Sequence, residues 1–140
     1  MKSTLSPGVS RINRFVVDPD RTISFMGEEG RVYATPWFVR DVEHTCRELI
    51  LEHVDPGEDS VGIEVAVKHM APTPPGMAVE ITATVTAVEG RRVAFTVTAK
   101  DEIEAIGSGT HARFVVDVAK TLERVKAKRA KLGAGGSGSR

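Results

Sequence analysis

The chain has 140 residues, 41% of them hydrophobic and 27% charged, which fits one folded domain and excludes a collagen-like or low-complexity protein. Its single cysteine, Cys46, excludes an internal disulfide and a zinc site built from several cysteines. The 19 basic and 19 acidic residues balance, but seven basic residues and one acid lie from Lys120 onward, so the rest of the chain is acidic and unsuited to binding nucleic acid.

The ends of the chain indicate its organisation and location. No apolar run approaches the ~18 residues that span a membrane, and the N-terminus has no apolar signal core, so we expect a cytoplasmic protein without a membrane partner. The basic segment from Lys120 onward is expected to be a solvated helix. Glycine and serine dominate the last residues and predict a flexible tail over 133–140. We therefore expect a single domain over residues 1–132.

The first predicted elements are a short strand and a long helix. Residues 12–18 are a β-rich run that ends at a turn around Pro19, and residues 22–34 are irregular. Thr35 can then cap a helix whose first position is Pro36, where the missing N–H is harmless. We expect this helix to run over residues 36–53, because a Pro-Gly pair at 56–57 follows.

Four later runs alternate apolar and polar residues and predict strands. They cover residues 61–69, 79–87, 93–99 and 112–118, and in the last run we expect Ala112, Phe114 and Val116 to face inward. Short turns between the runs indicate an antiparallel meander. Because the helix must bury its apolar stripe, the simplest packing is an α+β fold in which the antiparallel sheet wraps around one long central helix.

Glu43 does not fit the apolar stripe of the predicted helix. It shares one helix face with Val39, Cys46 and Ile50. A carboxylate in such a stripe is costly unless it has a partner. Glu43 is therefore either at the edge of the stripe, reaching solvent or an arginine, or a catalytic carboxylate.

Two further polar residues have a structural and a functional interpretation. His69 has the apolar parity of its strand, so it is either a core histidine or a general base or electrophilic donor. Thr35 is either an ordinary helix cap or a hydroxyl that orients a water or a carbonyl beside the outward-pointing backbone N–H groups of the helix start. Thr35 and Glu43 lie about 12 Å apart along the helix axis, so their spacing does not imply direct contact.

Five stretches, together with Glu43, resemble hot-dog-fold acyl-CoA thioesterases, most closely the fluoroacetyl-CoA thioesterase family. They occur in the order and roughly at the spacing of that family, across about residues 10 to 125. The stretches are ATPWFV (34–39), PGEDSVG (56–62), KHMAPTPPG (68–76), VEGRR (88–92) and IGSGTHAR (106–113).

The resemblance implies a site and an assembly. It assigns catalytic roles to Thr35, Glu43 and His69, and it places Gly62 and Arg113 near the acyl group. Strand parity puts Gly62 on the face opposite His69, unless a bulge at the glycine corrects it. The family also implies a homodimer whose sites use residues of both subunits, and a reaction that needs no metal and no cofactor apart from the CoA of the substrate.

The resulting hypothesis is an enzyme that hydrolyses an acyl-CoA thioester, with Glu43 as either general base or nucleophile. A non-catalytic acyl-CoA binding module is one alternative. A hot-dog acyl-CoA hydratase is the other alternative. Hydratases of this fold carry an aspartate five positions before a histidine, and no histidine of this chain has one there. The segment between residues 22 and 35 is shorter than the aromatic lid of the fluoroacetyl-specific enzyme and offers only Phe25 and Tyr33, so we expect a preference for another acyl group.

Overall fold

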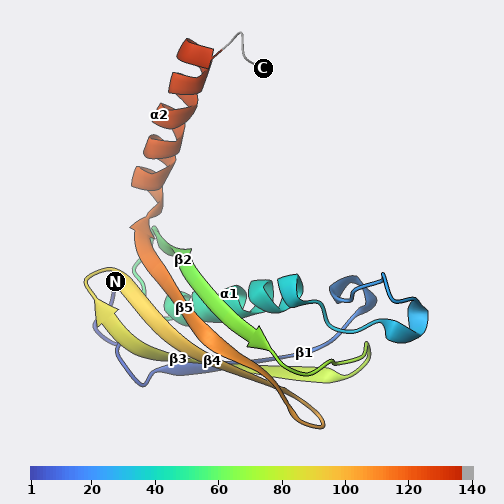
Figure 1. The fold of residues 1–140 in the computed structure, drawn as a ribbon. Helices are drawn as coiled ribbons and strands as arrows, with labels where there is room; N and C mark the ends of the chain where they lie inside the picture. The colour runs from blue at the N-terminus through green and yellow to red at the C-terminus, as the bar shows by residue number, and fades with distance from the viewer. Residues whose placement is uncertain (137–140) are drawn as a thin grey trace.

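The computed structural model describes residues 1–136, which form a curved five-stranded sheet, a helix against its inner face and a second helix beyond the last strand (Figure 1). Two short 3-10 helices, Pro19–Arg21 and Glu28–Gly30, lie between the first strand and the first helix. The main elements are β1 (Ser10–Val16), α1 (Thr35–Leu51), β2 (Glu58–His69), β3 (Ala78–Glu89), β4 (Arg92–Asp101), β5 (Ala105–Asp117) and α2 (Val118–Gly136).

The strand order is β1-β3-β4-β5-β2, and every neighbouring pair is antiparallel. β3, β4 and β5 form the predicted meander. The prediction was wrong for β2, which pairs with β5 at the opposite edge, while β1 takes the place beside β3. The link from Met70 to Met77 contains three prolines and is longer than a hairpin turn, so the chain is free to cross to the other side of the sheet.

The core lies between α1 and the inner face of the sheet, as predicted. Figure 1 shows the strands curving around this helix. Each large apolar side chain buried here stabilises the fold by about 1.5–3 kcal/mol. The helix contributes Phe38, Val42, Cys46, Leu49 and Ile50, and the sheet contributes Val79, Ile81, Ala83 and Val85 from β3 and Val93, Phe95, Val97 and Ala99 from β4.

The ends of α1 differ slightly from the prediction. The helix begins at Thr35 and its N-cap is Ala34, which has no side-chain cap. Thr35 therefore does not cap the helix. Its hydroxyl contacts His69 instead. The helix ends at Leu51, two residues earlier than expected, and the following residue, Glu52, closes it with backbone hydrogen bonds.

β5 presents the opposite face to the one predicted. Val115 and Arg113 are buried under α1, whereas Phe114 is 41% exposed on the outer face of the sheet. The inward arginine is tolerated because its guanidinium donates to the hydroxyl and to the backbone carbonyl of Ser60. Gly107 of the same strand lets the Phe38 ring approach, since a methyl group there would lie 2.7 Å from ring carbons.

α2 projects from the end of β5 away from the sheet (Figure 1). Its basic side chains are exposed, as expected, and so are Leu122, Val125 and Leu132. The helix continues to Gly136, so the predicted tail at 133–140 begins within it, and residues 137–140 lie outside the described part of the chain. Within residues 1–136, neither helix is long and apolar enough to cross a membrane.

Candidate active site

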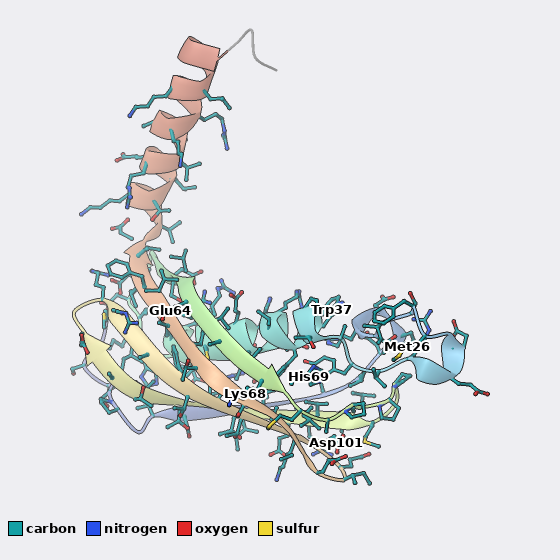
Figure 2. All side chains as sticks on the ribbon, viewed as in Figure 1. Met26, Trp37, Glu64, Lys68, His69 and Asp101 are labelled. Carbon is teal, nitrogen blue, oxygen red and sulfur yellow. The ribbon has the colours of Figure 1, made fainter. Side chains whose placement is uncertain are left out.

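A threonine and a histidine meet at the start of α1. Thr35 is the first residue of α1. His69, labelled in Figure 2, is the last residue of β2. Thr35 Oγ1 and His69 Nδ1 are 2.8 Å apart, within hydrogen-bond distance. The sequence predicted both residues but not their contact, because 34 positions separate them. We call these two residues the hydroxyl pair.

The His69 ring lies among aromatic side chains. Its centroid is 5.7 Å from the ring of Tyr33 and 5.2 Å from the ring of Phe38. Burial lowers the pKa of His69 below its ordinary value. His69 Nε2 is buried and has no hydrogen-bond partner among the described residues. These surroundings favour a neutral imidazole, which is the form that accepts a proton.

A hollow of about 430 Å³ adjoins the hydroxyl pair. Of the two aromatic residues expected at its mouth, Phe25 is 82% exposed, but Tyr33 is 2% exposed and belongs to the core. Tyr33 is drawn inward because its hydroxyl donates to the buried carboxylate of Asp41, at 2.6 Å. The wall of the hollow is mostly apolar and includes Ile23, Phe25, Val32, Met70, Ala71 and Pro72.

Glu43 lies two turns further along α1, opposite Gly62 on β2 and Arg113 on β5. A methyl group on Gly62 would lie 3.2 Å from Glu43 Oε1 and 3.4 Å from Arg113 Nη1, so the three residues border one small space. Burial lowers the pKa of Arg113, and the negative charge of Glu43 opposes that effect. We call Glu43, Gly62 and Arg113 the arginine cluster.

A bulge in β2 resolves the conflict in parity that the sequence left open. Gly62 pairs with Arg113 and Glu64 pairs with Ala112, so Ile63 is an extra residue on β2. The bulge shifts the alternation by one residue. Gly62 and His69 therefore lie on the same inner face, although their sequence parity is opposite.

Within one chain, the predicted site residues thus form two groups. The hydroxyl pair lies at the start of α1, and the arginine cluster lies eight residues further on, about 12 Å along the helix axis. The structure brings Thr35 to His69, and Glu43 to Gly62 and Arg113. The five assigned roles remain predictions.

His111 belongs to the surroundings of the arginine cluster and was not among the predicted site residues. This residue is 3% exposed, and its Nε2 lies 3.2 Å from Arg113 Nη1. Burial, together with the charge of Arg113, lowers the pKa of His111. The signal that finds it is parity, because His111 and Arg113 are two residues apart on one strand and share a face.

Cys46 is buried in the same region and is a poor nucleophile. Burial raises the pKa of its thiol to about 12, so the reactive thiolate is scarce at neutral pH. Among residues 1–136, no group of three or more His, Cys, Asp or Glu side chains is placed to hold a metal ion.

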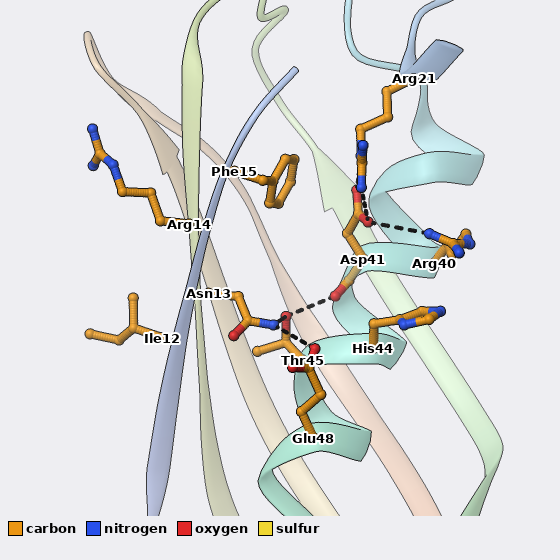
Figure 3. Close-up of a pocket in the computed structure, with 10 residues that line it drawn as sticks. All are labelled: Ile12, Asn13, Arg14, Phe15, Arg21, Arg40, Asp41, His44, Thr45 and Glu48. Carbon is orange, nitrogen blue, oxygen red and sulfur yellow. Dashed lines mark hydrogen bonds and ion pairs between the residues drawn. The ribbon is translucent and has the colours of Figure 1, made fainter. Parts of the chain in front are cut away.

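A second hollow, of about 400 Å³, lies between β1 and α1 (Figure 3). Its polar side chains pair with one another across the space. Arg21 donates to Asp41, and Asn13 donates to Thr45 and Glu48. Because these groups satisfy each other, we assign no ligand to this hollow.

The comparisons with known proteins agree on one class. The chain is 36% identical over 135 residues to a fluoroacetyl-CoA thioesterase of Streptantibioticus cattleyicolor, covering 91% of this chain and 97% of that protein. A solved fluoroacetyl-CoA thioesterase has a TM-score of 0.80 at 37% identity, covering 87% of this chain and 96% of that one. A variant of such an enzyme has been solved with fluoroacetate and CoA. A hot-dog-like protein of Thermanaerovibrio acidaminovorans also has a TM-score of 0.80, at 26% identity over 87% of this chain and 91% of that one.

The sheet around α1 is therefore a hot-dog fold of the kind found in thioesterases, which confirms the expected fold class. A family model of fluoroacetyl-CoA-specific thioesterases matches residues 17–119. The chain belongs to this family.

Proposed function

We propose that the protein hydrolyses an acyl-CoA thioester to a free acid and CoA. The contact between Thr35 and His69, beside an apolar hollow at the start of α1, is the observation that carries this proposal. Family membership supports it, as does the complex of a related enzyme with fluoroacetate and CoA. The cytoplasmic location and the lack of a nucleic-acid or membrane partner, expected from the sequence, remain part of the proposal.

The reaction needs an activated water and stabilisation of the charge that develops on the thioester oxygen. The start of α1 suits that oxygen, because the backbone N–H groups of a first helical turn point outward and carry the positive end of the helix dipole. Thr35 orients the attacking water or the carbonyl. Glu43 either takes the proton from the water or attacks the carbonyl carbon first.

The remaining residues complete the proton transfer and hold the acyl group. As the new C–O bond forms, the C–S bond breaks, and His69 relays the proton that comes from the water to the departing sulfur. If Glu43 attacks first, the product of that step is an acyl–Glu43 anhydride, and water then hydrolyses it to the free acid and restores the carboxylate. Gly62 and Arg113 border the acyl group. Nothing in this sequence of steps requires a metal or a cofactor, and CoA takes part only as the leaving group.

This mechanism needs a second copy of the chain. The two groups of site residues are about 12 Å apart in one chain, and β2 is an edge strand with Val61, Ile63 and Val65 exposed by 39–50%. An antiparallel pairing of two β2 strands would cover these edges. If the two-fold axis passes near the middle of β2, the end that holds His69 lies beside the start of the partner's β2. Each hydroxyl pair then faces the partner's arginine cluster, and the homodimer has two composite sites.

The test is release of the CoA thiol from a panel of acyl-CoA esters by the wild type and by Glu43→Gln. We expect the wild type to turn over at least one ester, and Glu43→Gln to lower kcat by about 10²-fold or more, the usual scale for losing an acid–base group. Glu48→Gln is the matched control on the same helix, because Glu48 bonds Arg11 and Asn13 instead. Full activity in Glu43→Gln contradicts the mechanism.

Tight binding of acyl-CoA without thiol release by the wild type favours the binding module, and addition of water to an enoyl-CoA favours the hydratase.

A further inference from the structure

His111 is held on two sides by polar groups and on a third by an aromatic ring. Its Nδ1 lies 2.7 Å from the backbone carbonyl of Glu64, and its Nε2 lies 3.2 Å from Arg113 Nη1. The imidazole stacks on Phe95 of β4, with ring centroids 6.1 Å apart and planes inclined by 24°. These contacts leave the ring a single orientation.

The two polar contacts also select one protonation state. A guanidinium can only donate hydrogen bonds, so His111 Nε2 must offer a lone pair to Arg113. A backbone carbonyl can only accept, so His111 Nδ1 must carry the hydrogen that is donated to Glu64. Both partners therefore require the same neutral tautomer, with its hydrogen on Nδ1.

The first consequence concerns Arg113. Its Nε donates to Ser60 Oγ and its Nη2 donates to the Ser60 carbonyl, each at 2.8 Å. With His111 accepting from Nη1, all three nitrogens of the planar guanidinium have a protein partner. The plane is thereby fixed with Nη1 at the edge of the space above Gly62.

The second consequence concerns the bulge in β2. A bulge disturbs the regular ladder around its extra residue, here Ile63. His111 donates to the carbonyl of Glu64, the residue that follows the bulge. It therefore ties the irregular part of β2 to β5. This same irregularity brings Gly62 to the inner face with His69.

We propose that His111 is a positioning residue of the site, which as a neutral imidazole links the carbonyl of the β2 bulge to Arg113 and so holds the arginine cluster in place for the acyl group. This inference rests on the proposed function. His111 acts through Arg113 and Gly62, and at the space above Gly62 it presents the carbon Cε1, which would lie 3.3 Å from a methyl group on Gly62.

Protonation of His111 would undo this arrangement. The charged ring has two donors and no acceptor, so it loses the hydrogen bond from Arg113 and brings a second positive charge beside it. The charged groups around the ring are Arg113 on β5 and Glu43 on α1, while β2 offers a backbone carbonyl and β4 the uncharged Phe95. The thiol of Cys46 on α1 lies near Arg113. Burial and Arg113 lower the pKa of His111, against the opposing effects of the Glu64 carbonyl and the Glu43 charge.

Two substitutions separate the two contacts. In His111→Gln, the longer side chain reaches the former Nε2 position with a carbonyl that accepts from Arg113. In His111→Asn, the shorter amide can donate to Glu64 but does not reach Arg113. We expect His111→Asn to raise KM for acyl-CoA by about tenfold or more, the scale of one hydrogen bond to a charged group, and His111→Gln to recover most of that loss. Equal KM values for the wild type and both variants overturn the proposal.

The pH profile distinguishes a positioning role of His111 from a general loss of structure, because only the positioning role changes the slope on the acid side. If both His69 and His111 must be neutral, log kcat/KM of the wild type falls with a slope of about two on the acid side. In His111→Gln the slope becomes about one, whereas the exposed control His44→Gln keeps a slope of about two. A slope that is unchanged in His111→Gln contradicts the proposal.

Nitrogen-15 spectra of histidine-labelled wild type test the tautomer even if a variant does not fold. The resonance assigned to His111 should show a protonated Nδ1 and an unprotonated Nε2 at pH 7. A protonated Nε2 overturns the proposal. If the wild type releases no thiol from any ester while this tautomer is observed, the proposed function fails but the contact from His111 to Arg113 stands.

Discussion

The hydroxyl of Thr35 contacts a histidine and does not cap the helix that Thr35 begins. A threonine at the start of a helix commonly stabilises the helix as its N-cap. Here Ala34 is the N-cap, and no side chain caps this end of α1. The Thr35 hydroxyl instead contacts His69. We therefore expect Thr35 to matter for the proposed reaction more than for the stability of the helix.

The variant Thr35→Ala separates these two roles. We expect kcat/KM to fall by at least about tenfold. The free energy of unfolding should change by less than the ~1 kcal/mol of a typical lost cap, because no capping bond is removed. Thiol-release kinetics and urea unfolding measure the two effects. A large loss of stability with kcat/KM unchanged would show that Thr35 is structural, and Thr35→Ser, which keeps the hydroxyl, should retain most of the activity.

The two buried histidines make stability depend on pH. The pKa values of His69 and His111 are lowered from about 6.5, mainly by burial. Between the lowered values and about 6.5, the unfolded chain binds more protons than the folded chain, so the free energy of unfolding falls as pH falls. Above about 6.5 this stabilisation is complete. We expect a lower urea midpoint at pH 5.5 than at pH 7.5, and a smaller difference in His111→Gln. A wild-type midpoint that is equal or higher at pH 5.5 contradicts this expectation.

At the scale of elements, the sequence predicts local pattern well and long-range pairing poorly. Strict alternation identified the inward residues of β3 and β4, and the apolar stripe identified α1. The pairing of β2 with β5 did not follow, because it depends on where the link after His69 leads. The inward parity of Arg113 was missed for a different reason. The contacts with Ser60 and His111 make a buried guanidinium acceptable, and the contact with Ser60 joins residues 53 positions apart.

The site residues themselves remain predictions, but the structure shows how they lie. Glu43 and His69 stood out because each breaks an apolar pattern, and Thr35, Gly62 and Arg113 were added by resemblance to a family. The separation of Thr35 from Glu43 was expected from the two helical turns between them, and a bulge near Gly62 was left open. Which residues join each of the two was not predictable, because the contact of Thr35 with His69 and the approach of Gly62 and Arg113 to Glu43 join distant parts of the chain.

The segment between β1 and α1 is anchored at its base and open at its tip. Thr22 and Tyr33 form a β-bridge, and the Ala34 N–H donates to the Arg21 carbonyl at 2.8 Å. At the tip, Phe25 is 82% exposed. A single exposed ring does not seal the hollow against water, so tight discrimination of small acyl groups is not expected.

Substrate selectivity tests this interpretation of the segment. We expect kcat/KM for fluoroacetyl-CoA and acetyl-CoA to differ modestly, with a longer or bulkier acyl-CoA preferred to both, because small apolar differences are worth only ~1–3 kcal/mol. The measurement compares acetyl-, fluoroacetyl-, butyryl- and phenylacetyl-CoA under one condition. A preference for fluoroacetyl over acetyl above roughly 10³-fold would show that the segment does close as a lid.

At the scale of the whole molecule, the proposed site residues of one chain form two separate groups. The hydroxyl pair and the arginine cluster lie at different places along α1, and the exposed apolar edge of β2 runs between the strand start near Gly62 and the strand end at His69. A symmetric dimer through β2 would cover the exposed edge strand and would also join each hydroxyl pair to the other chain's arginine cluster. The assembly is therefore part of the proposed catalytic mechanism.

Mixing two inactive variants tests this account most directly. Glu43→Gln and His69→Ala should each be nearly inactive as homodimers. After exchange of subunits, each mixed dimer has one site with both substitutions and one site with neither. The mixture should therefore regain about a quarter of wild-type thiol release, since half of randomly reassorted dimers are mixed and each has one intact site. If native mass spectrometry shows mixed dimers but the mixture is no more active than the separate variants, Glu43 and His69 do not act across the dimer, and the composite site is contradicted.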